Sequence, residues 1–205
     1  MRFLSLTILA ALGACTAADV QPTEPLAESE TAAVWSFAEH AQSLRAQSCP
    51  DGVSFRRADE ISIYVIEAER GSAEARDLNL KGMTLAGAWH LESERGFGGL
   101  SGLDVMRSGS LLSIADNGKF VWIGVDPETG APDGTGSMAY MHDGDGNVWS
   151  DKLAADAEGL SFRDGLAFVS FERDHRVEAY DLEGCGAAAR AALVGRLDTV
   201  VDGAQ

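Results

Sequence analysis

Two stretches of the chain resemble each other, and this internal repeat constrains the fold more than any other feature. Residues 102–126 (GLDVMRSGSLLSIADNGKFVWIGVD) align with residues 159–181 (GLSFRDGLAFVSFERDHRVEAYD), and the matched positions lie 55 to 57 residues apart. Each copy contains three short β-rich runs joined by a glycine turn and a polar corner. A repeat of about 50 residues with several strands is typical of a β-propeller blade. A chance likeness between two hairpins is the alternative.

Similar short runs, separated by Gly, Asp and Asn turn signals, continue from residue 60 to the end of the chain. No segment of 10–15 residues with helical period interrupts them. This pattern predicts an all-β protein of antiparallel strands and disfavours a parallel βαβ fold. The expected strands cover residues 61–67, 83–91, 100–106, 110–115, 120–125, 138–141, 159–162, 166–171, 177–180 and 192–197.

The chain length limits the number of blades. Each blade takes about 40–50 residues, so the segment 60–205 holds two to three. A closed propeller needs at least about four blades. We therefore expect an incomplete ring, and we interpret the chain as a truncated piece of a longer product.

The N-terminus has the features of an export signal. Residues 1–15 (MRFLSLTILAALGAC) contain the charged Arg2, an apolar run and small residues before Cys15. This order resembles a bacterial lipoprotein signal, which implies a lipid anchor on Cys15. The acidic retention signal is absent at Thr16, so the resemblance favours the outer membrane, facing the periplasm. An ordinary secretory signal with an incidental cysteine is the alternative.

A tether follows the signal. Residues 16–30 are small and acidic and include two prolines, a composition that cannot bury a core. Residues 31–47 have apolar positions at helical spacing and predict a short helix. We therefore divide the chain into a signal (1–15), a tether with a short helix (16–59) and a partial propeller domain (60–205).

The two remaining cysteines, Cys49 and Cys185, suit a disulfide because an exported chain enters an oxidising compartment. Two unpaired thiols are the alternative. Neither residue lies in a CxxC motif, so a zinc or redox site is not expected.

Charge restricts the ligands. The chain has 16 basic and 32 acidic residues, a formal net charge of −16. This charge argues against unaided binding to nucleic acid. A phosphate-bearing ligand would need a bridging metal ion or a local cluster of arginines.

Four elements between residues 97 and 181 carry a family resemblance. They are GGLSG at 98–102, ADNG at 115–118, DAEGL at 156–160 and FERDHR at 171–176. In this order they resemble the bacterial family called esterase-like activity of phytase, or phytase-like. The resemblance implies a six-bladed type of propeller that hydrolyses phosphate or carboxylic esters. Two departures are Asn117, where many members have arginine, and the missing C-terminal half.

Several acidic residues gather at equivalent places in the two repeats. Asp116 and Glu172 occupy matching corners, and Asp156 and Glu158 stand at the start of the second repeat. In a propeller such corners meet at one rim, where converging carboxylates repel unless a hard cation such as Ca²⁺ bridges them. We predict Asp116, Asp156 and Glu158 as metal ligands, with Glu172 as a further ligand or a catalytic group. A structural salt bridge is the alternative for Glu172.

The basic residues of the second corner complete the candidate site. Arg173 and Arg176 could bind the oxygens of an anionic substrate, and His175 could act as a general acid. The alternatives are a salt bridge for Arg176 and a solvated loop position for His175. Together these features predict an envelope-anchored, Ca²⁺-dependent phosphoester or ester hydrolase acting on a small anionic substrate. A non-enzymatic periplasmic propeller that binds a ligand or protein, or an inactive fragment, is the alternative.

Overall fold

The computed structural model describes residues 36–67, 87–93, 96–149 and 151–197. All of these residues belong to one compact unit, Ser36–Gln205. The predicted signal, the predicted tether of residues 16–30 and the first part of the predicted strand 83–91, residues 83–86, lie outside the described residues. Among the described helices, none has the length and apolar character needed to cross a membrane.

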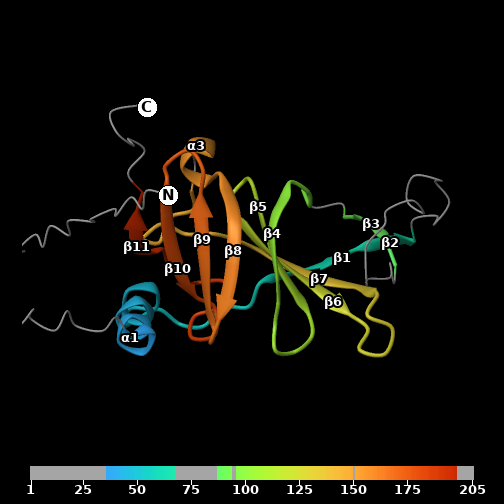
Figure 1. Cartoon of the computed structure of the whole chain (residues 1–205), viewed down its shortest axis with the longest axis horizontal. Helices are drawn as coiled ribbons and strands as arrows, with labels where there is room; N and C mark the ends of the chain where they lie inside the picture. The colour runs from blue at the N-terminus through green and yellow to red at the C-terminus, as the bar shows by residue number, and fades with distance from the viewer. Residues whose placement is uncertain (1–35, 68–86, 94–95, 150, 198–205) are drawn as a thin grey trace, which may run out of the picture. The chain divides into compact units, whose positions relative to one another are not determined.

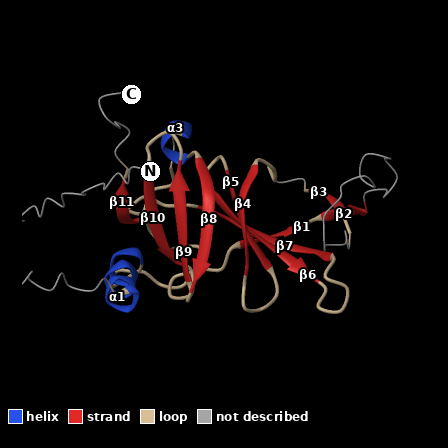
Figure 2. Cartoon of the chain, in the orientation of Figure 1, coloured by secondary structure: helices blue, strands red, loops and turns tan. Residues whose placement is uncertain are grey.

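The first large sheet has five antiparallel strands in the order β1-β7-β6-β5-β4 (Figures 1 and 2). Strands β4 to β7 follow one another in the chain and form an up-and-down meander, which we call blade A. Strand β1 comes from upstream and pairs with β7. The strands are β1 (Asp59–Ser62), β4 (Leu100–Val105), β5 (Leu111–Ala115), β6 (Lys119–Val125) and β7 (Pro132–Tyr140).

The second large sheet has four antiparallel strands in the order β11-β10-β9-β8 and forms a second meander, blade B. A one-turn helix, α3 (Lys152–Ala155), precedes it. Its strands are β8 (Ala157–Arg163), β9 (Leu166–Phe171), β10 (Arg176–Asp181) and β11 (Ala192–Arg196). Two consecutive antiparallel meanders confirm the prediction of an all-β, propeller-type fold, and the strands of the described segments do not close a ring.

The two blades repeat the same local structure. The first strand pair of each contains a register shift, between Leu100 and Leu103 in blade A and between Ala157 and Gly159 in blade B. An aspartate carboxylate holds the turn after the third strand of each blade. In blade A, Asp126 Oδ1 accepts from Thr129 N at 2.8 Å. In blade B, Asp181 Oδ1 accepts from Gly184 N at 3.0 Å. The repeat seen in the sequence is therefore a structural repeat.

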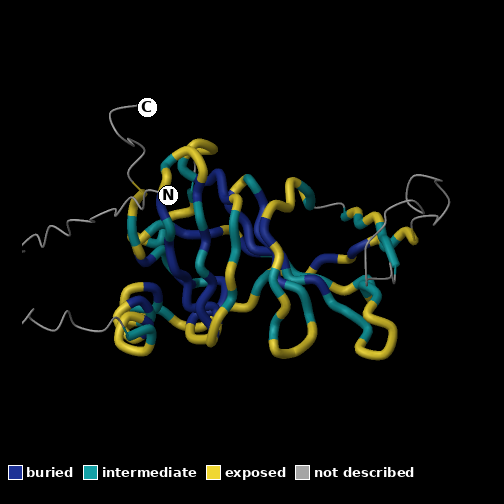
Figure 3. Tube along the Cα trace, viewed as in Figure 1, coloured by how far each residue is buried: buried dark blue, intermediate teal, exposed yellow. Residues whose placement is uncertain are grey.

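The blades pack through their first strands, β4 and β8. The Ser101 hydroxyl donates to the Ala157 carbonyl at 2.6 Å, and the Asp104 carboxylate accepts from Phe162 N at 2.6 Å. A Cβ on Gly102 would lie 2.7 Å from the backbone nitrogen of Leu160, so only glycine permits this approach. The largest core cluster of the described residues combines side chains of both blades, such as Ile114 of β5 and Val169 of β9. Figure 3 shows much of the trace of blade B as buried.

Helix α1 (Phe37–Ser48) packs on the face of blade B that points away from the largest core cluster. Leu44 packs against Ala179 and Ala192. A disulfide between Cys49 and Cys185 ties the end of the helix to blade B, with the two Cα atoms 5.7 Å apart. The predicted pairing of these cysteines is therefore present in the structure.

A two-stranded hairpin of β2 (Tyr64–Glu67) and β3 (Trp89–Glu92) extends from blade A and contributes Val65 and Leu91 to a second core cluster. The predicted strand 61–67 is thus divided between β1 and β2. Strand β7 begins at Pro132, before the predicted segment 138–141. Its first half was not predicted because it is rich in glycine and polar residues. A Cβ on Gly136 would lie 2.9 Å from the Trp122 carbonyl, so this glycine permits close pairing with β6.

Candidate metal site at the rim of blade B

The start of the first strand and the corner after the second strand lie at the same end of each blade. We call this end the rim: residues 96–101, 116–118, 151–158 and 172–175. In blade A, Asp116 N donates to the Gly99 carbonyl at 2.9 Å. In blade B, Glu172 N donates to the Asp156 carbonyl at 3.0 Å. The same bond therefore fixes the corner in both blades.

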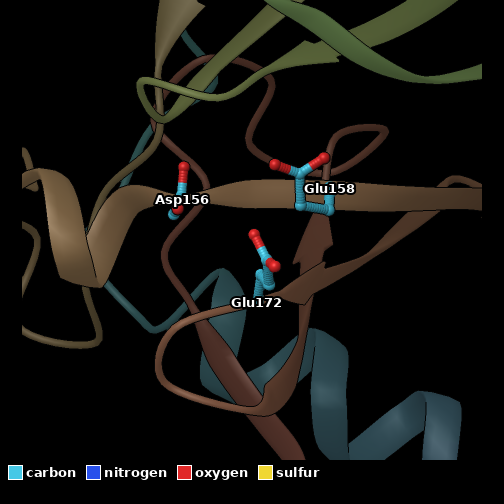
Figure 4. A group of neighbouring side chains, drawn as sticks. All are labelled: Asp156, Glu158 and Glu172. Carbon is cyan, nitrogen blue, oxygen red and sulfur yellow. The ribbon is translucent and has the colours of Figure 1, made fainter.

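Three carboxylates converge at the rim of blade B. Asp156 follows α3, Glu158 stands at the register shift of β8, and Glu172 follows β9 directly. One oxygen of each lies within 4.8 Å of the others, and Figure 4 shows Glu172 directed toward β8. Oxygens around one Ca²⁺ ion lie 2.3–2.6 Å from it and so up to about 5 Å apart. The donor type and the spacing both fit a calcium ion.

Arg173 contributes a positive charge beside these acids. Its Nε donates to Asp156 Oδ2 at 2.7 Å, and this hydrogen bond with the Asp156 charge raises the pKa of Arg173. The Asp156 side chain is 7% exposed, whereas that of Arg173 is 58% exposed. Among the described residues, Asp156 Oδ1 accepts no hydrogen bond and Glu172 forms no ion pair. Both carboxylates therefore keep an oxygen available for a cation.

Asp116 does not join this group, which corrects its prediction as a ligand of the same ion. In blade A, glycine occupies the position equivalent to Asp156, and Ser101 the position equivalent to Glu158. Gly99 has φ +63°, and a Cβ there would lie 2.3 Å from the Asp116 carboxylate. Asp116 instead lies 3.8 Å from Lys152 Nζ. The first corner therefore has one carboxylate where the second has three.

Arg176 is buried, so the structure does not support its prediction as a substrate contact. Its side chain is 1% exposed, and its Nε donates to Glu178 at 2.8 Å. Its Nη1 donates to Asp174 at 3.2 Å and its Nη2 to the Ala154 carbonyl at 2.7 Å. The guanidinium also lies over the rings of Trp149 and Phe171. Arg176 connects the corner after β9 to the end of α3, which is a structural role.

His175 lies at the exposed tip of the same corner, outside the carboxylate group. Its backbone carbonyl accepts from Leu197 N at 2.8 Å. The solvated loop position fits His175 better than the predicted role as a general acid. Glu172, predicted as a ligand or a catalytic group, lies in the carboxylate group with Asp156 and Glu158.

Helix α3 is a part of the rim that the sequence did not predict. The Asp151 carboxylate caps it by accepting from Leu153 N at 2.9 Å. Lys152 of this helix, which precedes blade B, lies near the Asp116 carboxylate of blade A. Four residues are too few for a periodic pattern, and the Asp151 cap was the only signal in the sequence.

A family model described as "Phytase-like: Esterase-like activity of phytase" matches residues 95–199, which include both blades and the carboxylate group. No curated protein and no solved structure matched the chain. The chain therefore belongs to the phytase-like family, whose model describes an esterase-like activity of phytase.

Proposed function

We propose that the rim of blade B binds Ca²⁺ and that the protein hydrolyses phosphoesters or carboxylic esters of small anionic substrates there. The convergence of Asp156, Glu158 and Glu172 carries the proposal. Three carboxylates from two segments, the start of β8 and the corner after β9, repel one another, and a bound divalent cation would relieve that repulsion. Membership of the phytase-like family supports the hydrolytic part.

Each side chain has a distinct task in this proposal. Asp156, Glu158 and Glu172 hold the cation, and the backbone bond between residues 172 and 156 fixes their relative position. A bound Ca²⁺ would neutralise and polarise the ester oxygen of the substrate. Arg173 bonds Asp156 through Nε alone among the described residues, so its two terminal nitrogens remain available for a substrate oxygen. This local charge lets a protein of net charge −16 accept an anion.

We further place this activity in the bacterial cell envelope, on the strength of the lipoprotein-like signal at residues 1–15 and the cysteine at its end. Labelling cells with a radioactive fatty acid tests the anchor. Incorporation that is lost in Cys15→Ser supports it, and equal incorporation in both chains would exclude it.

Hydrolysis assays on the full chain test the proposed activity. We would follow p-nitrophenyl phosphate and p-nitrophenyl acetate with Ca²⁺ and with EDTA. The variants are Glu158→Gln and Glu172→Gln, which keep side-chain size and remove charge. Glu128→Gln is the matched control, because Glu128 is exposed in the turn after β6, at the opposite end of blade A from the rim.

We expect hydrolysis that requires Ca²⁺, that falls at least about tenfold in each rim variant and that is unchanged in the control. Hydrolysis that is insensitive to EDTA and to both rim variants would refute the site. Calcium binding without any hydrolysis would refute the enzymatic role and leave the binding propeller as the function.

A further inference from the structure

A second site, outside the rim carboxylates, lies where the segment before β1 crosses the end of β7. A cavity of about 220 Å³ is formed there, with Arg56, Arg57, Asp59, Tyr140, His142 and Val148 among its lining residues. We infer that this cleft binds a small organic anion, a carboxylate or a phosphate monoester, through Arg56 and Arg57.

Arg56 is held in place by its backbone. Its N–H donates to the Cys185 carbonyl at 3.1 Å, and its own carbonyl accepts from Ala187 N at 2.8 Å. Its Nη2 donates to the Ala187 carbonyl at 2.8 Å and lies 3.3 Å from His142 Nε2. Nε and Nη1 have no partner among the described residues. A fixed guanidinium with three unused N–H groups suits a carboxylate or phosphate.

His142 lines the cleft beside Arg56. A guanidinium has no acceptor, so a hydrogen bond here requires His142 Nε2 to accept from Arg56, and His142 Nδ1 is buried without a hydrogen-bond partner among the described residues. Burial, followed by the Arg56 charge, lowers the pKa of His142. The residue is 9% exposed. The positive charge of the cleft therefore comes from the arginines.

The balance of charge in the cleft is positive. Arg57 is exposed and has no ion-pair or hydrogen-bond partner among the described residues. Asp59 is the acidic residue in the lining, Asp143 also acts on His142, and Arg190 adds a further positive charge nearby. Two arginines against one lining carboxylate are notable in a chain of net charge −16. An anion that enters the cleft is attracted by both arginines.

The walls indicate an organic ligand. Tyr140 and Val148 are 51% and 46% exposed and contribute apolar surface beside the arginines. The volume is that of roughly seven waters, enough for a small aryl acid. A mixture of apolar surface and fixed polar groups can bind both parts of an organic anion.

Isothermal titration of the full chain with phenyl phosphate, benzoate and inorganic phosphate tests this inference. EDTA is present throughout, so that cation-dependent binding at the rim does not contribute. Arg57→Gln is the main variant because its side chain has no partner to lose, and Arg56→Gln is the second. Arg107→Gln is the control, because Arg107 is exposed and pairs with Asp164 away from the cleft. A thermal melt of each variant checks folding.

We expect saturable binding of an aryl anion that weakens about tenfold in Arg57→Gln and stays unchanged in Arg107→Gln. Tighter binding of phenyl phosphate than of benzoate would assign a phosphate ester, and the reverse a carboxylate. The inference would be overturned by the absence of saturable binding, by native affinity in both Arg56→Gln and Arg57→Gln, or by binding of inorganic phosphate alone. Failure of the rim site would leave these results unaffected.

Discussion

Removing the Cys49–Cys185 disulfide should destabilise the protein strongly. The bond joins residues separated by 136 positions. The chain-entropy model gives about 5 kcal/mol for a loop of this length, while measured disulfides typically contribute about 2–4 kcal/mol. The bond fixes the end of α1 and the segment that leads to β1, so native contacts also depend on it. We therefore expect a loss of about 3–5 kcal/mol in the free energy of unfolding.

Urea unfolding, followed by tryptophan fluorescence, measures this loss. The paired variant Cys49→Ala/Cys185→Ala is compared with the native pair, and Cys15→Ser is present in every sample to exclude other pairings. Adding dithiothreitol should shift the native pair and leave the double variant unchanged. A difference below about 1 kcal/mol would show that the cross-link does not restrict the unfolded chain, and would refute the reasoning.

Three further predictions concern the core and the blade contact. Arg176→Met should cost about 3–5 kcal/mol in urea unfolding, because it leaves the buried Glu178 without its ion-pair partner, and the double variant Arg176→Met/Glu178→Gln should cost less. A cost below about 0.5 kcal/mol, typical of an exposed site, would contradict the buried network. Gly102→Val should lower the free energy of unfolding by about 1–3 kcal/mol, because it overpacks β4 against β8. Gly195→Ala has open space around it and should change that free energy little. Equal losses in the two variants would contradict the close approach of β4 to β8. The folded state lowers the pKa of His142 below 6.5, so the unfolded chain binds more protons and stability should fall as pH decreases below about 6.5. This fall should be smaller in His142→Gln. The same dependence of stability on pH in both proteins would show that His142 does not cause it.

The repeat predicted the blades because it carried two independent signals. Alternating apolar runs marked the strands, and the matched turns fixed their order. The close contact between β4 and β8 was not predictable, because Gly102 reads as an ordinary strand glycine until Leu160 is placed against it. The long β7 was missed for a related reason, since its pairing depends on glycines that weaken the strand pattern.

The candidate site was predicted in part. The sequence placed Asp156, Glu158 and Glu172 at one corner, and the structure brings them together. It could not show that Arg176 points into the core, since spacing does not reveal burial. Equivalence between repeats also suggested Asp116, but glycine and serine replace the two neighbouring acids in blade A. The arginine cleft joins segments more than 80 residues apart, so no local motif marked it.

Calcium titration by calorimetry tests the rim site most directly. We would compare the full chain, freed of metal by EDTA and dialysis, with Glu158→Gln/Glu172→Gln and with the Glu128→Gln control. Because carboxylate ligands set calcium affinity, we expect one ion per chain in the native and control proteins and at least about tenfold weaker binding in the double variant. Identical binding curves for all three proteins, or no binding to the native chain, would contradict the assignment of the metal site.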